Sequence, residues 1–399
     1  MSEGPRVLMP ADIRFPLERA NGVQIVKTAA ALAAEGLPTT LLVRRSDPRP
    51  TRDVLHFYGL EPPPALEVAR LRVGHRRGAF RLPRAAFLAR ALWRAARQLR
   101  RGGVVFTRDL QLADLLLRFG PARPGALVYE AHAVEALMYA ERGALYGTGE
   151  ARDPRKQRRL AAREARVWRG AHGFVATTAG IRDSFAEAHG PRERVRVVPN
   201  GCDPPRGAFP GLSREDPPRV LYAGQLYPWK GVDVLVEAMA SVAGARLVIL
   251  GGLAGEPDFD RVQRLAAARG LEGRVEMPGT VPQARVAQEL SRASVVAVPF
   301  LRTAMTERHT SPLKAFEAMA AGRPIVATDL PSSREVLRHD ETALLVPPGD
   351  AAALGAAVGS LLGDPALAER LARGAFAAAP AYSWEARARA LAALFAEVA

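Results

Sequence analysis

The chain has 399 residues, 48% of them hydrophobic, and a single cysteine. At roughly 150 residues per domain, this length predicts two or three globular domains and excludes a small scaffold held together by disulfide bonds. The 56 basic and 41 acidic side chains leave a net charge of +15, which favours an anionic partner. The lone cysteine fits a reducing compartment, residues 1–10 lack the apolar stretch of a signal peptide, and no apolar run reaches the roughly 18 residues of a membrane span. A cytoplasmic location is therefore expected.

Short apolar strands alternate with segments of helical length in two series. In the first series we predict strands at 7–9, 39–43, 104–107, 127–130 and 174–177, with a helix at 22–35. In the second series we predict strands at 220–223, 246–250, 295–299 and 324–328, with helices at 232–240, 259–268 and 313–320. Runs of branched apolar residues between helices are typical of parallel sheets buried on both faces. The sequence therefore predicts an α/β protein with two doubly wound, Rossmann-like domains.

A proline-rich segment separates the two series. Residues 204–218 hold five prolines and two glycines, a composition that disfavours both helix and sheet. We predict an interdomain linker there, between an N-terminal domain at 1–203 and a C-terminal domain at 219–380. Residues 381–399 are predicted to form a last helix that packs back toward the N-terminal domain. Because ligands of open parallel sheets bind beyond the carboxyl ends of the strands, we expect functional residues in strand-to-helix loops.

The positive charge is concentrated in the first half of the chain. The stretch from Arg70 to Arg101 holds eleven arginines and no acidic residue. In a helix over 83–101, apolar side chains share one face, while Arg90, Arg94 and Arg97 lie on the other. Such a helix binds an anionic membrane surface or a lipid-linked anionic acceptor, or it packs on its own domain with its charges solvated. Nucleic acid is the least favoured partner because aromatic residues are sparse.

The most informative loop follows the predicted strand at 220–223. Gly224 turns the chain there, and Lys230 stands just before a helix, whose free N–H groups favour an anion. The chain has only four lysines among its 56 basic residues, so an ammonium group at this point indicates a positional requirement. A phosphate site is one interpretation, and a solvated lysine at a helix start is the other.

A second strand-to-helix loop precedes the predicted helix at 313–320. We predict Ser311 as the N-cap of this helix. Backbone N–H groups near Leu313 and Lys314 would then be available to an anion. Glu317, in the following turn, carries a carboxylate suited to two hydrogen bonds from a vicinal diol such as a ribose. Complementarity with the helix dipole is the alternative interpretation of this residue.

Further runs extend this pattern over nearly all of residues 195–399. They are Val-Pro-Asn-Gly-Cys-Asp at 198–203, Tyr-Ala-Gly-Gln-Leu at 222–226 with Lys-Gly at 230–231, Leu-Gly-Gly at 250–252, Arg-Val-Glu-Met-Pro-Gly at 274–279, Arg-Pro-Ile-Val-Ala-Thr at 323–328 after the helix, and Tyr-Ser-Trp-Glu at 382–385. In this order and at this spacing, the runs resemble the retaining glycosyltransferases of family 4. The resemblance implies a GT-B fold, in which two Rossmann-like domains bind a nucleotide sugar in the cleft between them.

The resemblance is thinner in the first domain but reaches two of its residues. Gly22 falls where the family has a glycine loop near the donor phosphate, and His132 falls where the family has a histidine that faces the reacting sugar. A lone histidine after a strand is otherwise a structural residue. By resemblance, His132 and Lys230 are the catalytic candidates, with N–H groups near Leu313 on the diphosphate and Glu317 on the ribose.

Two positions depart from the family pattern. Gln225 stands where the family commonly has an arginine on the diphosphate, and Lys314 is a candidate to replace the lost charge. His309 stands at the first of two family glutamates, the one that faces the donor sugar. Glu307, His309 and Ser311 are therefore the candidates to face that sugar, whose identity stays open.

The resemblance implies transfer of a sugar to an acceptor hydroxyl with retention, using the departing phosphate as the base. The acceptor is expected to be lipid-linked or a cell-envelope polysaccharide. No cofactor is expected. A sugar-nucleotide epimerase of the same fold and a non-catalytic protein that binds nucleotide sugars are the alternatives.

Two other motifs receive a structural interpretation. Asp258 and Asp260 have the spacing of a metal-binding pair, but acidic residues are also favoured at a helix start, so we expect no metal site. Cys202 has no histidine or second cysteine near it in sequence and is expected to be a small buried residue instead of a nucleophile.

Overall fold

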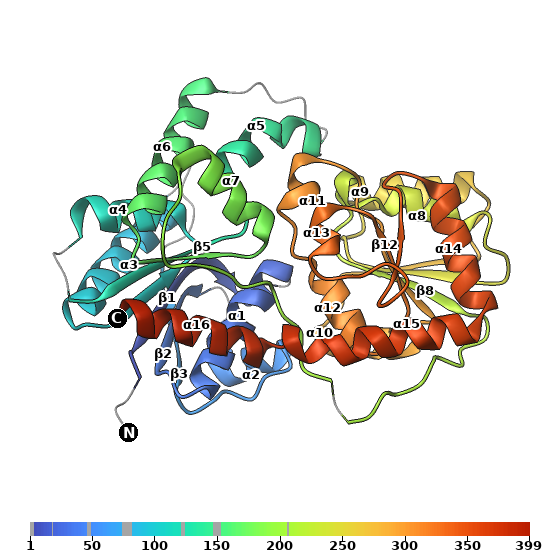
Figure 1. Cartoon of the computed structure of the whole chain (residues 1–399), viewed down its shortest axis with the longest axis horizontal. Helices are drawn as coiled ribbons and strands as arrows, with labels where there is room; N and C mark the ends of the chain where they lie inside the picture. Colours follow the sequence, from blue (N-terminus) through green and yellow to red (C-terminus); the bar gives the residue numbers. More distant parts are fainter. Residues whose placement is uncertain are drawn as a thin grey trace. The chain divides into compact units, whose positions relative to one another are not determined.

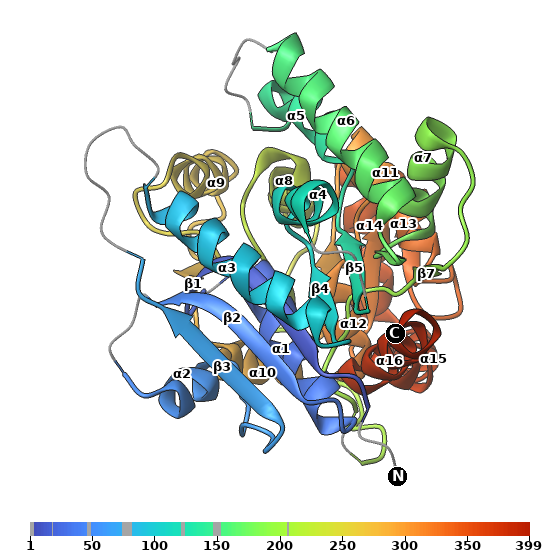
Figure 2. The same cartoon turned by 90° about the vertical axis from the view of Figure 1, so that its left-hand side faces the viewer.

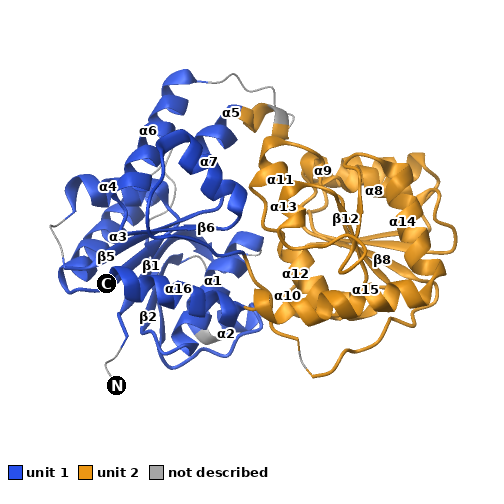
Figure 3. Cartoon of the chain, viewed as in Figure 1, with its two compact units in different colours: residues 1–140, 152–199, 384–399 blue, residues 141–151, 200–383 orange. Residues whose placement is uncertain are grey.

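Two parallel β-sheets organise the chain, one in each of two units. The computed structural model describes residues 4–17, 19–45, 49–73, 82–120, 124–146, 153–205 and 207–399. Unit 1 comprises 1–140, 152–199 and 384–399, and unit 2 comprises 141–151 and 200–383 (Figure 3). The α/β class predicted from the alternation of apolar strands and helical segments is confirmed (Figure 1).

The sheet of unit 1 has the strand order β3-β2-β1-β4-β5-β6-β7, with every pair parallel. Its strands are β1 (Val7–Phe15), β2 (Thr39–Arg45), β3 (Leu66–Leu71), β4 (Val104–Thr107), β5 (Ala126–Ala131), β6 (Gly173–Ala176) and β7 (Val195–Val197). Its helices are α1 (Ala20–Ala34), α2 (Thr51–Phe57), α3 (Leu82–Arg100), α4 (Leu110–Phe119), α6 (Pro154–Gly170), α7 (Ala179–His189) and α16 (Trp384–Val398), and α5 (Glu135–Tyr146) is shared with unit 2.

Helices cover both faces of this sheet. Val105 of β4 packs in a cluster with side chains of α3, which crosses in front of the sheet in Figure 2. The next residue, Phe106, points to the opposite face and packs edge-on against Phe395 of α16. The last helix of this chain therefore belongs to unit 1, where it packs beside α1.

The sheet of unit 2 has the strand order β10-β9-β8-β11-β12-β13 and is also parallel. Its strands are β8 (Arg219–Ala223), β9 (Arg246–Leu250), β10 (Val275–Gly279), β11 (Val295–Val298), β12 (Ile325–Thr328) and β13 (Leu344–Val346). Its helices are η1 (Pro228–Lys230), α8 (Val232–Met239), α9 (Pro257–Ala268), α10 (Gln283–Arg292), α11 (Ala304–Arg308), α12 (Leu313–Ala320), α13 (Pro331–Arg334), α14 (Ala351–Gly363), α15 (Pro365–Ala378) and η2 (Ala379–Tyr382).

The sequence pattern located the central strands better than the peripheral ones. Every residue of β4, β11 and β12 is buried, which gives the continuous apolar runs from which they were predicted. The strands β3 and β10 are partly exposed along most of their length, and both lie at sheet edges. An edge strand is covered only in part, so it does not need a continuous apolar run. For this reason the sequence did not predict β3 or β10.

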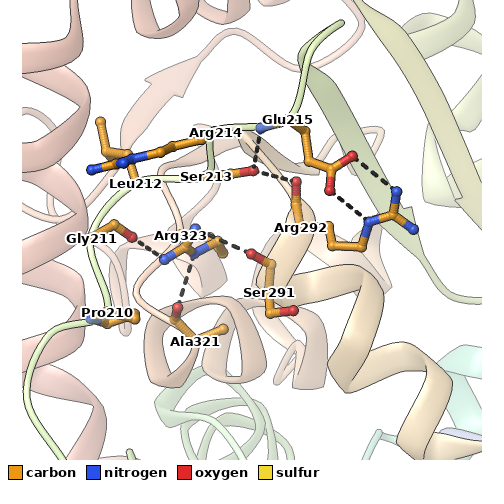
Figure 4. Close-up of a pocket in the computed structure, with 10 residues that line it drawn as sticks. All are labelled: Pro210, Gly211, Leu212, Ser213, Arg214, Glu215, Ser291, Arg292, Ala321 and Arg323. Carbon is orange, nitrogen blue, oxygen red and sulfur yellow. Dashed lines mark hydrogen bonds and ion pairs between the residues drawn. The ribbon is translucent and has the colours of Figure 1, made fainter.

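The proline-rich segment 204–218 lies within unit 2 and does not separate the units; the chain instead enters unit 2 between Pro199 and Asn200. Arg292, at the end of α10, binds the Glu215 carboxylate through two nitrogens at 2.8 and 2.9 Å, and Arg323 donates to the Gly211 carbonyl (Figure 4). The prolines prevent helix and sheet in this segment. The segment is nevertheless held to unit 2 by side chains of that unit, so it is not a free linker.

A cavity of about 370 Å³ lies beneath this segment. Arg323 in its lining is buried, and besides Gly211 it donates to the Ala321 carbonyl at 2.9 Å and the Ser291 carbonyl at 3.4 Å (Figure 4). The cavity lies near the amino ends of β11 and β12, whereas ligands of such sheets bind at the carboxyl ends. The charged groups of Glu215, Arg292 and Arg323 in its lining are engaged by other lining residues, so we interpret the cavity as structural.

Among the helices that the structure describes, none is individually long and apolar enough to cross a membrane. Residues 351–363 and 365–382 meet the length and composition required only as a pair, which is bent by 100° at the break between them.

Candidate active site

The candidate site of unit 2 lies at the carboxyl ends of β8 and β11, where the strand order reverses. β8 pairs with β9 on one side and with β11 on the other, an arrangement that leaves room for a ligand beyond the strand ends. The loop after β8 leads to Gly231, whose φ of 72° lies in the left-handed region. A Cβ atom at this position would lie 1.7 Å from the carbonyl oxygen of Pro299, just after β11. Glycine therefore allows the two loops to pack together beside Lys230.

Two lysine ammonium groups lie near the same aromatic ring in this site. Lys230 Nζ is 4.8 Å from the ring centroid of Phe300, and Lys314 Nζ is 5.1 Å from it. Lys230 Nζ also lies 3.9 Å from the ring of Trp229, and Lys314 Nζ lies 3.8 Å from the ring of Tyr222. Because the faces of aromatic rings carry negative potential, they partly compensate the positive charges for the loss of water.

The electrostatics of the two lysines favour a bound anion. Burial lowers the pKa of Lys230 to about 7. Burial, and then the charge of Lys230, hold the pKa of Lys314 well below its ordinary range, although Glu317 opposes this shift. Lys314 Nζ is buried and makes no hydrogen bond within the described part of the chain. An anion would supply the missing partner and favour the protonated form of both lysines.

Glu317 and the start of α12 lie in the same part of unit 2. Glu317 Oε1 accepts a hydrogen bond of 2.8 Å from Gln283 Nε2, at the start of α10. Within the described structure no side chain caps α12, which begins at Leu313 after the cap residue Pro312. The positive end of this helix is therefore open to an anion near Lys314.

The prediction that Ser311 caps α12 is wrong. Its hydroxyl instead accepts a hydrogen bond of 2.9 Å from the backbone N–H of Asn200, and its carbonyl accepts one of 2.9 Å from Asn200 Nδ2. The side chain is thus engaged by the segment that enters unit 2. Of the other two residues predicted to face the donor sugar, Glu307 pairs with Arg302, and His309 is buried at the end of α11.

A second polar cluster lies in unit 1, around the end of β5. His132 Nε2 and Glu130 Oε2 are hydrogen-bonded at 2.9 Å. Gln24 of α1 donates to the same carboxylate oxygen at 3.2 Å and accepts a hydrogen bond of 2.9 Å from Arg108, which follows β4. The other oxygen of Glu130 pairs with Arg387 of α16. The sequence predicted His132 alone, because Glu130 was read as the end of an apolar strand.

Gly22 lies in the first turn of α1. A Cβ atom there would lie 2.2 Å from the carbonyl oxygen of Leu17. The close approach of the preceding turn therefore explains why glycine stands at this position. A contact with the donor phosphate stays a prediction.

Asp258 and Cys202, which we expected to have structural roles, both contact other residues of unit 2. Asp258 pairs with Arg261 at 3.2 Å, and the described residues contain no cluster of three or more side chains suited to a metal ion. Cys202 is buried, and its Sγ lies 3.6 Å from the carbonyl oxygen of Tyr382.

Comparison with known families explains both halves of the chain. Residues 208–377 match the model described as "Glycosyl transferases group 1", and residues 21–201 match the "Glycosyl transferase 4-like domain". The chain belongs to the family 4 glycosyltransferases. The two models together span most of both units, and they confirm the resemblance drawn from the sequence motifs.

The chain is also similar to individual curated proteins. It is 32% identical over 251 residues to the D-inositol 3-phosphate glycosyltransferase of Xylanimonas cellulosilytica, a match that covers 59% of each chain. The chain spans less than two thirds of the length of the curated relatives it matches.

Solved structures support the fold over the whole chain. The sucrose-phosphate synthase of Thermosynechococcus elongatus has a TM-score of 0.74 at 22% identity and covers 99% of this chain and 98% of its own. HepE of Anabaena, in complex with UDP-glucose, has a TM-score of 0.71 at 17% identity, with coverage of 98% and 100%. These likenesses confirm the expected GT-B fold of the glycosyltransferase.

The basic helix of the glycosyltransferase packs its apolar face inward. Phe87 and Ala91 of α3 are buried in the core of unit 1. Arg90 and Arg97 are exposed, as is Trp93, 62% of whose surface is accessible and near whose ring Arg97 lies. The apolar face is therefore not available to insert into a bilayer, and α3 presents guanidinium groups and one aromatic ring.

Proposed function

We propose that this chain transfers a sugar from a nucleotide-diphosphate donor to an acceptor hydroxyl with retention of the anomeric configuration. Family membership supports the reaction class. The observation that carries the proposal is the pair of ammonium groups, Lys230 and Lys314, around Phe300. They lie beyond the carboxyl ends of β8 and β11, where ligands of such sheets bind, and Lys314 Nζ has no hydrogen-bond partner among the described residues.

The chemistry follows from the charge that forms during transfer. The bond between the anomeric carbon and the β-phosphate oxygen breaks, and negative charge grows on the departing nucleoside diphosphate. Lys230, Lys314 and the N-terminus of α12 would stabilise that charge, and one well-placed donor typically contributes about 3–4 kcal/mol in such a site. The departing phosphate then takes the proton of the acceptor hydroxyl as the new glycosidic bond forms on the same face.

Lys314 accounts for the departure from the family pattern at Gln225. The family commonly has an arginine at that position, and Gln225 removes its charge from the loop after β8. Lys314 approaches from α12, close enough that Gly224, beside Gln225, would place a Cβ atom 3.2 Å from Lys314 Nζ. We infer that the charge on the diphosphate has moved from one loop to the other.

The donor is proposed to be held through its ribose by Glu317, with Gln283 orienting the carboxylate. HepE, which shares the fold, binds UDP-glucose, and this supports a nucleotide sugar as the class of donor. Glu307 and His309 are the candidates for the side of the site that faces the sugar.

The acceptor is proposed to be anionic and to bind unit 1. The exposed guanidinium groups of α3 favour a phosphate-bearing partner, either a lipid-linked acceptor or the surface of an anionic membrane at which the protein is peripheral. A relative is named for D-inositol 3-phosphate, itself a phosphate ester, which supports this class of acceptor.

Nucleotide release tests the proposal. UDP-, GDP- and ADP-sugars would be supplied with and without a membrane extract, and the released diphosphate measured. We expect release that depends on the acceptor and is lost in Lys230→Ala and Glu317→Ala. Lys156→Ala is the matched control, because Lys156 belongs to unit 1, where its Nζ lies 4.3 Å from the ring centroid of Tyr139.

The same assay separates the alternatives. Donor turnover without an acceptor supports an epimerase, and donor binding without turnover of any donor supports a non-catalytic binding protein. Because the lysines supply the positive charge at the phosphate site, we propose that no metal ion is required. The rate is therefore expected to be unchanged by a chelator, and a rate restored only by Mg²⁺ would contradict this.

A further inference from the structure

Arg387 of the last helix forms a buried ion pair with Glu130 of β5. Both residues are only 3% exposed. Besides pairing with Glu130, Arg387 donates through Nε to Thr28 Oγ1 at 3.0 Å. Its Nη1 donates to the carbonyls of Val198 and Pro199 at 2.8 and 2.7 Å. All three guanidinium nitrogens are therefore engaged, so the position of Arg387 is fixed.

The pair is connected to His132 through the second oxygen of Glu130. This oxygen lies 2.9 Å from His132 Nε2 and accepts a further hydrogen bond of 3.2 Å from Gln24. The Glu130 carboxylate is thus shared between a guanidinium on one side and the imidazole and an amide on the other. Arg387 is therefore linked to His132 through one carboxylate, and its charge also acts on the imidazole directly.

The proton of the imidazole can be placed from this arrangement. Burial opposes ionisation of Glu130, but the guanidinium of Arg387 and then His132 hold its pKa well below the usual range. An ionised carboxylate only accepts hydrogen bonds, so Nε2 of His132 must carry the proton. A neutral imidazole then has no proton on Nδ1, which is left as an acceptor.

The imidazole is neutral because it is buried and because the charges that face it are positive in sum. They are Glu130 from β5, Arg108 from the loop after β4 and Arg387 from α16. Burial, and then the positive charge of Arg108, lower the pKa of His132 to about 4, although Glu130 opposes this. Two guanidinium groups and one carboxylate already leave a positive excess, and a protonated imidazole would add a second uncompensated charge.

We propose that Arg387 is a positioning residue for glycosyl transfer: it fixes Glu130, which orients His132, and its own positive charge helps to keep His132 neutral, with Nδ1 as a hydrogen-bond acceptor for a substrate hydroxyl. This inference rests on the proposed function, because it gives His132 a defined part in that reaction. Glu130 orients the ring and Arg387 sets the charge of the site. A purely structural role would instead confine Arg387 to fastening α16 onto unit 1.

The pH profile of transfer distinguishes the two roles. In Arg387→Met the positive excess around His132 is lost, while the Glu130 carboxylate stays and favours the imidazolium. The acid limb of kcat is then expected to move upward by about one pH unit or more, with little change in the donor KM. Arg387→Lys retains the charge and is expected to restore the limb to its original position.

Two further variants guard against a trivial loss of folding. The double variant Arg387→Met/Glu130→Gln removes both charges of the buried pair, so the acid limb is expected to return toward that of the unmodified chain. Arg389→Met is the control on the same helix, because Arg389 is exposed and pairs with Glu35 at 3.3 Å on the surface. It is expected to leave the profile unchanged.

A direct readout needs no activity. Nitrogen NMR of the unliganded protein, with the His132 signals assigned by His132→Asn, is expected to show a neutral ring protonated on Nε2 at pH 6. In Arg387→Met the titration of His132 is expected to move upward by about one pH unit or more. An identical titration of His132 in both proteins, or a proton on Nδ1, would overturn this inference alone. An unmodified chain that turns over no donor would instead overturn the proposed function, and the reaction role of His132 with it.

Discussion

Lys230 and Lys314 come from different strand-to-helix loops, yet their ammonium groups lie 4.8 and 5.1 Å from the centroid of one ring, that of Phe300. Two positive charges that share one partly desolvated space repel each other. The arrangement costs stability in the unliganded protein and becomes favourable when a diphosphate is bound. Stability and binding should therefore respond to these residues in opposite directions.

Replacement of Lys314 by methionine is expected to stabilise the protein. Lys314 Nζ is buried without a hydrogen-bond partner in the described structure, and an unsatisfied buried polar group costs about 1–3 kcal/mol. Methionine keeps the length of the side chain and removes the charge. Thermal unfolding should show a Tm raised by a few degrees, whereas Lys156→Met should have little effect. A lowered Tm for Lys314→Met would contradict this expectation.

Binding of a nucleoside diphosphate is expected to take up protons. Because burial lowers the pKa of Lys230 to about 7, this lysine is mostly neutral at pH 8 in the unliganded protein, and a bound diphosphate favours its ammonium form. Calorimetry at pH 8 in buffers of different ionisation enthalpy should therefore detect the uptake. Lys230→Arg, which stays charged, should reduce it by about one proton. At pH 6, where Lys230 is already protonated, the same substitution should change it little. Equal uptake by both proteins at pH 8 would rule out this role for Lys230.

Gly231 is expected to tolerate no side chain, because a Cβ atom would lie 1.7 Å from the Pro299 carbonyl oxygen. Gly244 offers a matched control, since its φ of 70° is close to the 72° of Gly231 but nothing lies within 4 Å of its Cβ position. Gly244→Ala should cost about 1–2 kcal/mol from its backbone conformation alone. Gly231→Ala should cost clearly more and reduce transfer. Similar losses in Tm for the two variants would show that the contact between the loops is unimportant.

The basic face of α3 is expected to bind anionic membranes. Each basic residue near such a surface contributes about 1 kcal/mol, so replacing Arg90, Arg94 and Arg97 by glutamine should weaken binding to phosphatidylserine vesicles by roughly 100-fold at low salt. Three exposed arginines of unit 2, at positions 214, 264 and 285, provide a control with the same change in net charge.

Competition between vesicles and a soluble phosphate ester distinguishes an acceptor headgroup from a membrane surface as the partner of α3. If inositol phosphate competes with the vesicles, the surface recognises an acceptor headgroup, whereas competition by salt alone indicates a membrane surface. Absence of vesicle binding by the unmodified chain would refute the membrane role.

The sequence predicted the residues of unit 2 that lie near the start of a helix following a strand, because their positions follow from the alternation of elements. Lys230, Lys314 and Glu317 could be named in this way. It did not predict Tyr222 or Phe300 beneath the ammonium groups, because both read as ordinary apolar residues of a strand and its end. Their role depends on which lysine approaches them, and that is set by tertiary packing.

The buried pair in unit 1 was missed for a different reason. Glu130 and Arg387 are 257 positions apart, and neither belongs to a local motif. The only available signal was a carboxylate at the end of an apolar strand, where a charge needs a partner. The prediction for Ser311 failed similarly, because the backbone N–H that binds its hydroxyl comes from Asn200, far away in sequence.

The central claim is that Lys230 and Lys314 hold the phosphates of the donor. Its most direct test is the affinity of the unmodified chain, Lys230→Met and Lys314→Met for a nucleoside diphosphate and for the corresponding nucleoside, measured by calorimetry after UDP, GDP and ADP have been compared. Each substitution should weaken diphosphate binding by about tenfold or more and leave nucleoside binding unchanged. Equal losses for both ligands, or none for the diphosphate, would contradict it.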